Sequence, residues 1–205
     1  MSLIIHFMLG YISSFIGTTP PSMLNMTTAK ITLKKTKKEG LKFALGVSSI
    51  VLIQAYIALI FASYIHNNSN FERYLQVVGI FIFIVLSVYF YKQAVQESKQ
   101  EVKSNKKFKN SFVVGLMLST LNMFAIPFYC GVSSALNMFG LFEFNQANIL
   151  LFVIGSALGT YSLLYVYASA AIKIQKKATL LTKNLNYILS GLTAFIALVT
   201  FIKIL

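Results

Sequence analysis

The sequence predicts an all-α integral membrane protein of six transmembrane helices, arranged as a three-plus-three inverted repeat with helices one and four broken near the midplane. Long uncharged stretches, lysines gathered in alternate loops and recurring short motifs predict this fold. Of the 205 residues, 57% are hydrophobic and 11% are charged, against roughly 45–50% and about 25% in soluble domains. A chain of this length cannot bury so much apolar surface in a soluble core.

Six stretches of the chain contain no Asp, Glu, Lys or Arg, namely 2–29, 43–65, 74–91, 110–142, 144–172 and 184–202. A bilayer core about 30 Å thick takes roughly 20 apolar helical residues, so each stretch can cross once or nearly so. The start of the chain has no positive region, so we expect a retained first span and not a signal peptide. We expect a single transmembrane domain over 1–205, with repeat one at 1–91, a cytoplasmic linker at 92–109 and repeat two at 110–205.

The basic residues predict the orientation in the membrane. Sixteen of the eighteen Lys and Arg residues lie in the first, third and fifth loops. Lys and Arg are enriched in cytoplasmic loops, so both termini are expected on the non-cytoplasmic side of a bacterial inner (cytoplasmic) membrane. The net charge of +13 therefore reflects topology and contact with the lipid bilayer, and we expect no nucleic acid partner.

Three motifs recur in order along the two halves of the chain, with offsets of 105, 109 and 112 residues. They are Phe7-x-x-Gly10 with Phe112-x-x-Gly115, Phe43-x-x-Gly46 with Phe152-x-x-Gly155, and Gly79 with Gly191. Because each half has three spans, the second copy must enter the membrane upside down. Inverted repeats of this kind are typical of secondary transporters, which bind substrate near the midplane.

All three prolines, Pro20, Pro21 and Pro127, lie in the equivalent spans one and four. Gly17 precedes two residues that can cap a helix, Thr18 and Thr19, so the prolines are expected to start a new half-helix. Two half-helix N-termini near the midplane would attract an anion such as an amino-acid carboxylate. A simple proline kink remains the alternative.

Uncharged polar residues within the spans are the candidates for binding a substrate. These are Thr18, Thr19, Ser22, Asn25, Gln54, Tyr56, Asn122, Tyr161 and Tyr165. Each could instead bridge helices by hydrogen bonding. Gly155 and Gly159 are expected to allow close helix packing, and Cys130 is expected to be an inert buried thiol.

No Asp or Glu lies within any span, which argues against an exporter of divalent metal ions. Two histidines and no Asp leave neither a metal site nor a catalytic triad, so we expect no enzyme activity and no cofactor. The candidates for proton coupling are His6, which could instead anchor the chain at the interface, and Glu39.

Several of these segments resemble the LysE-type (LysE/RhtB) amino-acid exporter family over nearly the whole chain. The residues are Gly-Thr-Thr-Pro-Pro-Ser at 17–22, Lys-Lys-Glu-Gly-Leu at 37–41, Ala-Leu-Gly at 44–46 and the run from Phe112 to Asn122. They are similar to the family's proline motif, basic-glycine loop, second-helix glycine and second-half Asn-Pro motif. The family's Pro-Gly-Pro is here Pro20-Pro21-Ser22, and Pro127 lies several residues beyond Asn122.

The resemblance implies six helices and export of small amino acids or related metabolites by a secondary transporter. The in-span residues offer no counter-charge for a cationic substrate, so a neutral amino acid is preferred. The alternative is a non-transporting membrane scaffold or assembly factor that docks a cytosolic partner through its lysine-rich loops. The substrate, the coupling ion and the existence of a homodimer are left open by the sequence.

Overall fold

The structure is a computed structural model that describes residues 3–20, 22–67, 110–122 and 124–171, with isolated positions at 84, 88, 91, 191 and 194. The described residues form α-helices and their connections, with no strand among them. The helices are α1 (Leu3–Gly17), α2 (Met23–Lys34), α3 (Lys37–His66), α5 (Ser111–Thr120), α6 (Ala125–Met138) and α7 (Gln146–Ser169).

These helices belong to one compact unit, formed by Met1–His66 and Phe108–Lys176. A second unit comprises Asn67–Lys107 and Lys177–Leu205, of which only isolated positions are described. The predicted third and sixth spans and the predicted linker 92–109 therefore lie outside the described residues, apart from those positions. The described unit draws its helices from both halves of the sequence.

Two helices of the described residues, α3 and α7, are each long and apolar enough to cross a membrane. They contain the predicted spans 43–65 and all but the ends of 144–172. Helices α5 and α6 meet at a bend of 64° and count as a third span if they are taken together. The apolar part of α1, Ile4–Gly17, is shorter.

The helices extend beyond the apolar stretches into the first lysine-rich region. The expected loop between residues 30 and 42 is mostly helical, because α2 continues to Lys34 and α3 begins at Lys37. Lysine is a good helix former, and its long stem can lie along a helix while the ammonium group reaches water. Thr36 caps α3, where its Oγ1 accepts a hydrogen bond from the Glu39 amide at 3.2 Å.

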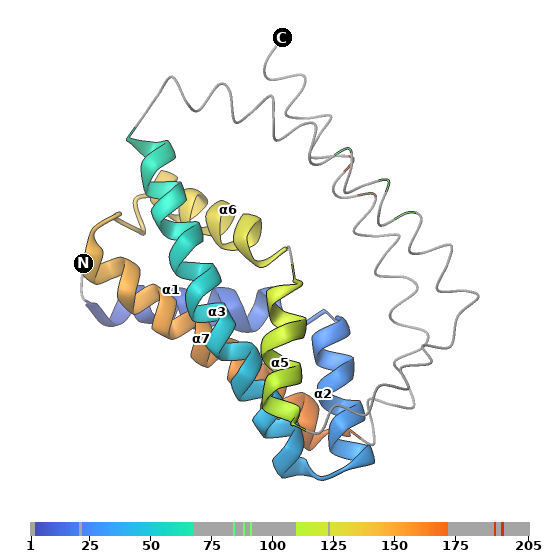
Figure 1. The fold of residues 1–205 in the computed structure, drawn as a ribbon. Helices are drawn as coiled ribbons and strands as arrows, with labels where there is room; N and C mark the ends of the chain where they lie inside the picture. Colours follow the sequence, from blue (N-terminus) through green and yellow to red (C-terminus); the bar gives the residue numbers. More distant parts are fainter. Residues whose placement is uncertain are drawn as a thin grey trace. The chain divides into compact units, whose positions relative to one another are not determined.

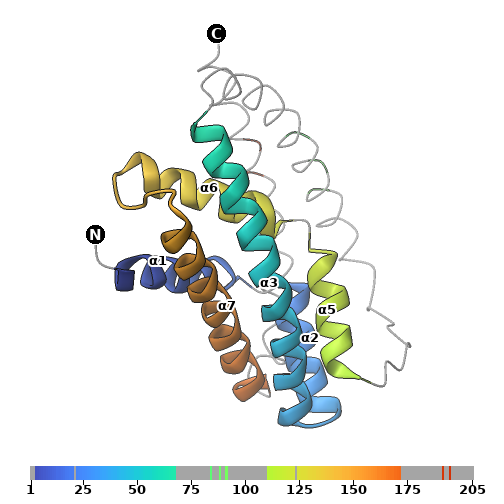
Figure 2. The same cartoon turned by 60° about the vertical axis from the view of Figure 1, so that its left-hand side comes forward.

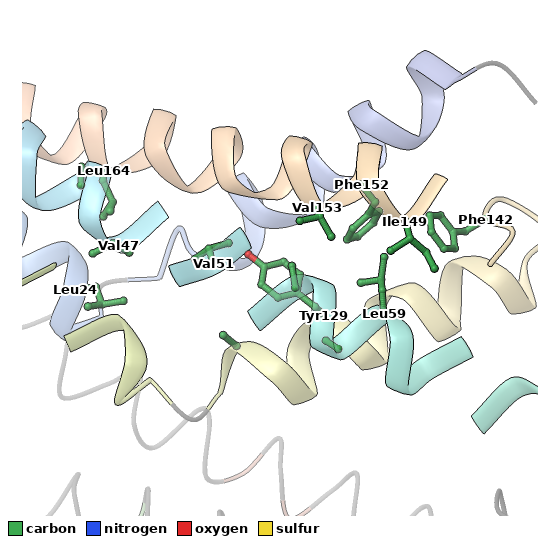
Figure 3. Packing of buried hydrophobic residues seen from close by; sticks show 14 of the residues in the cluster. Leu24, Val47, Val51, Leu59, Tyr129, Phe142, Ile149, Phe152, Val153 and Leu164 are labelled. Atoms are coloured by element: carbon green, nitrogen blue, oxygen red, sulfur yellow. The ribbon is translucent and has the colours of Figure 1, made fainter. Parts of the chain in front are cut away.

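Helix α3 lies at the centre of the unit, in contact with α2, α5, α6 and α7, while α1 packs mainly on α7 (Figures 1 and 2). The buried side chains between these helices are almost all apolar, and Figure 3 shows Tyr129 of α6 extending toward Val51 of α3. The labelled core residues are Leu24, Val47, Val51, Leu59, Tyr129, Phe142, Ile149, Phe152, Val153 and Leu164.

Glycines allow the helices to touch backbone to backbone. A Cβ atom at Gly155 would collide with the carbonyl of Phe7, and one at Gly159 would collide with that of Tyr11. The expected close packing at these two glycines is therefore confirmed. Helices α1 and α7 approach closely because neither carries a side chain at the point of contact.

Candidate functional site

The first break separates α1, which ends at Gly17, from α2, which begins at Met23. The helix cap is Ser22 and not the expected Thr18 or Thr19, since Ser22 Oγ accepts a hydrogen bond from the Asn25 amide at 3.4 Å. The two threonine hydroxyls instead donate to carbonyls one turn back, each at 2.7 Å. Hydroxyls commonly bond in this way near helix ends. Pro20 lies in the connection, and Pro21 lies outside the described residues.

The carbonyl groups of the first break are satisfied by side chains. Asn25, which is buried, donates through Nδ2 to the carbonyls of Thr18 and Pro20 at 2.7 and 2.9 Å. The hydroxyl of Tyr167, on α7, donates to the carbonyl of Thr19 at 2.9 Å. Non-helical backbone at membrane depth requires such partners.

The second break separates α5, which ends at Thr120, from α6, which begins at Ala125. Asn122 lies half-buried in the connection, and Pro127 lies in the first turn of α6. Proline is tolerated there because its missing N–H has no partner within the helix. Gln54 of α3 spans the break, where its Nε2 donates to the carbonyls of Ser119 and Asn122 at 2.9 and 3.3 Å.

The end of α1 and the beginning of α6 lie against each other. Ser14 Oγ is 2.9 Å from the Tyr129 hydroxyl and 2.7 Å from Thr160 Oγ1, so three buried hydroxyls join α1, α6 and α7. A Cβ atom at Gly17 would collide with the ring of Phe128. Two segments more than one hundred residues apart in the sequence are thereby brought together.

The three candidate tyrosines do not form one cluster. The Tyr56 hydroxyl accepts a hydrogen bond from Gln146 Nε2 at 3.2 Å. The Tyr165 hydroxyl accepts one from Lys37 Nζ at 3.5 Å, and this ammonium also lies 4.6 Å from the centre of the Tyr165 ring. Both tyrosines are exposed and contact opposite ends of the α3–α7 pair. Tyr161 is half-buried against the apolar core.

His6 and Glu39, the candidates for proton coupling, lie in different surroundings. His6 is buried rather than exposed at an interface, with its ring 5.4 Å from that of Phe142. Neither of its ring nitrogens has a hydrogen-bond partner among the described residues. Glu39 joins α3 to α5, because its carboxylate accepts from Ser111 Oγ at 2.6 Å and pairs with Lys42 at 2.8 Å.

Four residues that hold the breaks together were not predicted from the sequence: Ser14, Tyr129, Thr160 and Tyr167. A single hydroxyl in an apolar helix has the same local pattern whether it faces lipid or a neighbouring helix. The repeated Ser14 and Ser119 are the signal that could have found part of this set. Within the described part of the chain, no three His, Cys, Asp or Glu side chains gather to hold a metal ion.

The long apolar helices and the polar breaks between them define a helical membrane protein. The chain matches the LysE type translocator family over residues 15–203 and belongs to that family. Membership makes it a transporter of the membrane rather than an enzyme, and it does not favour the scaffold alternative. No curated protein and no solved structure matches the chain significantly.

Proposed function

We propose that this translocator exports amino acids or similar small metabolites across the bacterial inner membrane by alternating access. The observation that carries the proposal is the meeting of two polar helix breaks, where Ser14 bonds Tyr129 and Gly17 packs on Phe128. Broken helices that meet inside the membrane are a common way to bind a small polar substrate.

The proposed inverted repeat is supported by reciprocal glycine contacts. In the first, Gly10 packs on the carbonyl of Phe152 and Gly155 on that of Phe7. In the second, Gly115 packs on the carbonyl of Phe43 and Gly46 on that of Phe112. The sequence offsets of 105 and 109 residues convert one set of contacts into the other. Two three-helix copies that exchange equivalent helices would produce this pairing.

A second pair of contacts follows the same relation. The contact of Lys37 with Tyr165 and the contact of Gln146 with Tyr56 are exchanged by the offset of 109 residues. These contacts join opposite ends of α3 and α7. An inverted repeat would place one such contact toward each side of the membrane, where alternating access needs an entrance and an exit.

In this proposal the substrate passes the polar groups at the two breaks, of which Thr18, Thr19, Asn25 and Asn122 are the nearest in sequence. Gly17, Pro20, Pro21 and Pro127 set the ends of the half-helices. If transport is coupled to protons, His6 and Glu39 are the side chains to replace first. Both termini lie on the non-cytoplasmic side, opposite the lysine-rich loops.

Counterflow in proteoliposomes tests the proposal. Vesicles are loaded with one unlabelled amino acid at a time, and uptake of trace label is followed with and without a pH gradient. Accumulation of one labelled amino acid is the expected result. Failure of folded protein to accumulate any neutral, basic or acidic amino acid would contradict amino-acid export.

The broken-helix mechanism has its own test. Replacement of Pro20, Pro21 and Pro127 by Ala should lower counterflow strongly, because alanine lets each helix continue through its break. Full transport by this triple variant would show that the breaks are not needed.

Membrane sidedness is tested with a thiol reagent that cannot cross membranes, applied to intact cells. With Cys130→Ser as background, a cysteine at Ser2 should react and one at Thr36 should not. The reverse pattern would invert the proposed topology.

A further inference from the structure

The two breaks differ in how their polar groups are satisfied. At the first break, Asn25 and Tyr167 donate to three successive carbonyls, at 2.7 to 2.9 Å, and Ser22 caps α2. These bonds are made within the protein. The first break is therefore closed by its own side chains and leaves little for a ligand to bind.

The second break has no such closure at the start of α6. The cap position is occupied by Phe124, and no side chain accepts from the first N–H groups of this 14-residue helix. The Ala125 amide reaches the carbonyl of Asn122 only at 3.4 Å. Uncapped N–H groups at the start of a helix, together with the helix dipole, favour a carboxylate or another anion.

Gln54 supplies an independent observation at this break. Its side chain is 93% buried, since only 7% is exposed, and its Nε2 donates to the carbonyls of Ser119 and Asn122. The two carbonyls determine the orientation of the amide, because the flipped amide would set its oxygen against both of them. Asn122 thus shares its carbonyl between Gln54 and the first amide of α6.

The remaining atom of that amide, Gln54 Oε1, is buried and has no hydrogen-bond partner among the described residues. A buried acceptor without a donor is unfavourable, and native proteins almost always supply one from the protein, from water or from a ligand. The amide oxygen carries no net charge. It suits a donor such as an ammonium group on a molecule that is neutral overall.

We propose that the second break is the substrate-binding one: Gln54 Oε1 accepts a hydrogen bond from the substrate's ammonium group, and the N-terminus of α6 binds its carboxylate. This inference rests on the proposed function and names the ligand chemistry, a neutral zwitterion with both groups on one carbon. Gln54 and the α6 terminus meet at one carbonyl, so their separation suits a small molecule. The first break serves as a structural joint.

The test uses the amino acid with the fastest counterflow in wild-type proteoliposomes, together with its desamino acid and its decarboxylated amine as competitors. For alanine these are propionate, which lacks the ammonium group, and ethylamine, which lacks the carboxylate. The measured quantity is the ratio of the competitor's half-inhibiting concentration to that of the unlabelled amino acid. A lost charge-assisted hydrogen bond corresponds to about tenfold to a hundredfold, so the wild-type propionate ratio should exceed about ten.

In Gln54→Leu the propionate ratio should fall toward one while the ethylamine ratio is retained, because only the ammonium loses its partner. A residue that acted only on packing would change both ratios alike or neither. Gln54→Asn keeps an amide but withdraws it by one methylene, and it serves if the leucine variant does not fold. The matched control is Tyr167→Phe, which removes the bond to Thr19 at the first break and should leave both ratios unchanged.

Two results would overturn the inference. Gln54 variants that transport with the wild-type propionate ratio would mean that Oε1 faces only water. An equal fall of that ratio in Tyr167→Phe would mean that the first break binds the ammonium as well. Failure of the proposed function is distinguishable from both, because the wild-type protein would then show no amino-acid counterflow at all.

Discussion

At the scale of single residues, four glycines decide how closely the helices approach. Each of Gly10, Gly46, Gly115 and Gly155 lies against a carbonyl of the neighbouring helix, with no room for a Cβ atom. Gly131 of α6, in contrast, has nothing within 4 Å of the position that an added methyl group would occupy. The same substitution at the two kinds of site should therefore have opposite effects.

We predict that Gly155→Ala lowers the free energy of unfolding by about 1–3 kcal/mol, because the helices must separate to admit the methyl group. Gly131→Ala should raise it by up to about 1 kcal/mol through helix propensity. Chemical unfolding in detergent, followed by circular dichroism, measures both. Equal stability of the two variants would contradict the close approach of α1 and α7.

The hydroxyls of Ser14, Tyr129 and Thr160 act as one group, since Ser14 bonds both of the others. Tyr129→Phe should cost about 1 kcal/mol of unfolding free energy and still leave Ser14 bonded to Thr160. In the Ser14→Ala background the same change should cost less. A double-mutant cycle measures this coupling, and additive effects would show that the two hydroxyls do not interact.

At the scale of helices, the cap of α2 positions the side chains that close the first break. Ser22→Ala should destabilise the protein by about 0.5–2 kcal/mol, because an N-terminal amide loses its acceptor. The control is Ser49→Ala, whose hydroxyl bonds only to the Leu45 carbonyl of its own helix. The difference in thermal unfolding between these variants checks the position of the cap; no difference would mean that Ser22 does not cap α2.

Helix type and approximate extent were predictable from composition for α3 and α7, because long apolar runs have few alternatives in a membrane. The beginning of α2 was not predictable to the residue. Thr18, Thr19 and Ser22 can all cap a helix, and the choice depends on Asn25 and Tyr167 binding the intervening carbonyls. Those partners become neighbours only after the chain has folded.

At the scale of the whole molecule, the crossed contacts of Tyr56 with Gln146 and Tyr165 with Lys37 join opposite ends of α3 and α7. If transport alternates between two open states, each contact must separate at some stage. The contacts are exposed and long, so little free energy opposes their opening.

We therefore predict that a covalent bridge across either contact stops counterflow. In a Cys130→Ser background, the pairs Tyr56→Cys with Gln146→Cys and Lys37→Cys with Tyr165→Cys are joined with a short bismaleimide. Single-cysteine variants treated with the same reagent should retain transport. Undiminished counterflow in fully bridged protein would argue against movement at that end.

The sequence by itself determined that the protein is helical, lies in the membrane and belongs to the LysE type translocators. Apolar runs, lysine positions and short motifs are local properties that need no knowledge of neighbours. Only the tertiary structure decided that Asn25 and Tyr167 close the first break while Gln54 leaves an unpaired oxygen at the second. The physical reason is that a hydrogen bond depends on which polar group of a distant helix comes within reach, and packing alone determines that.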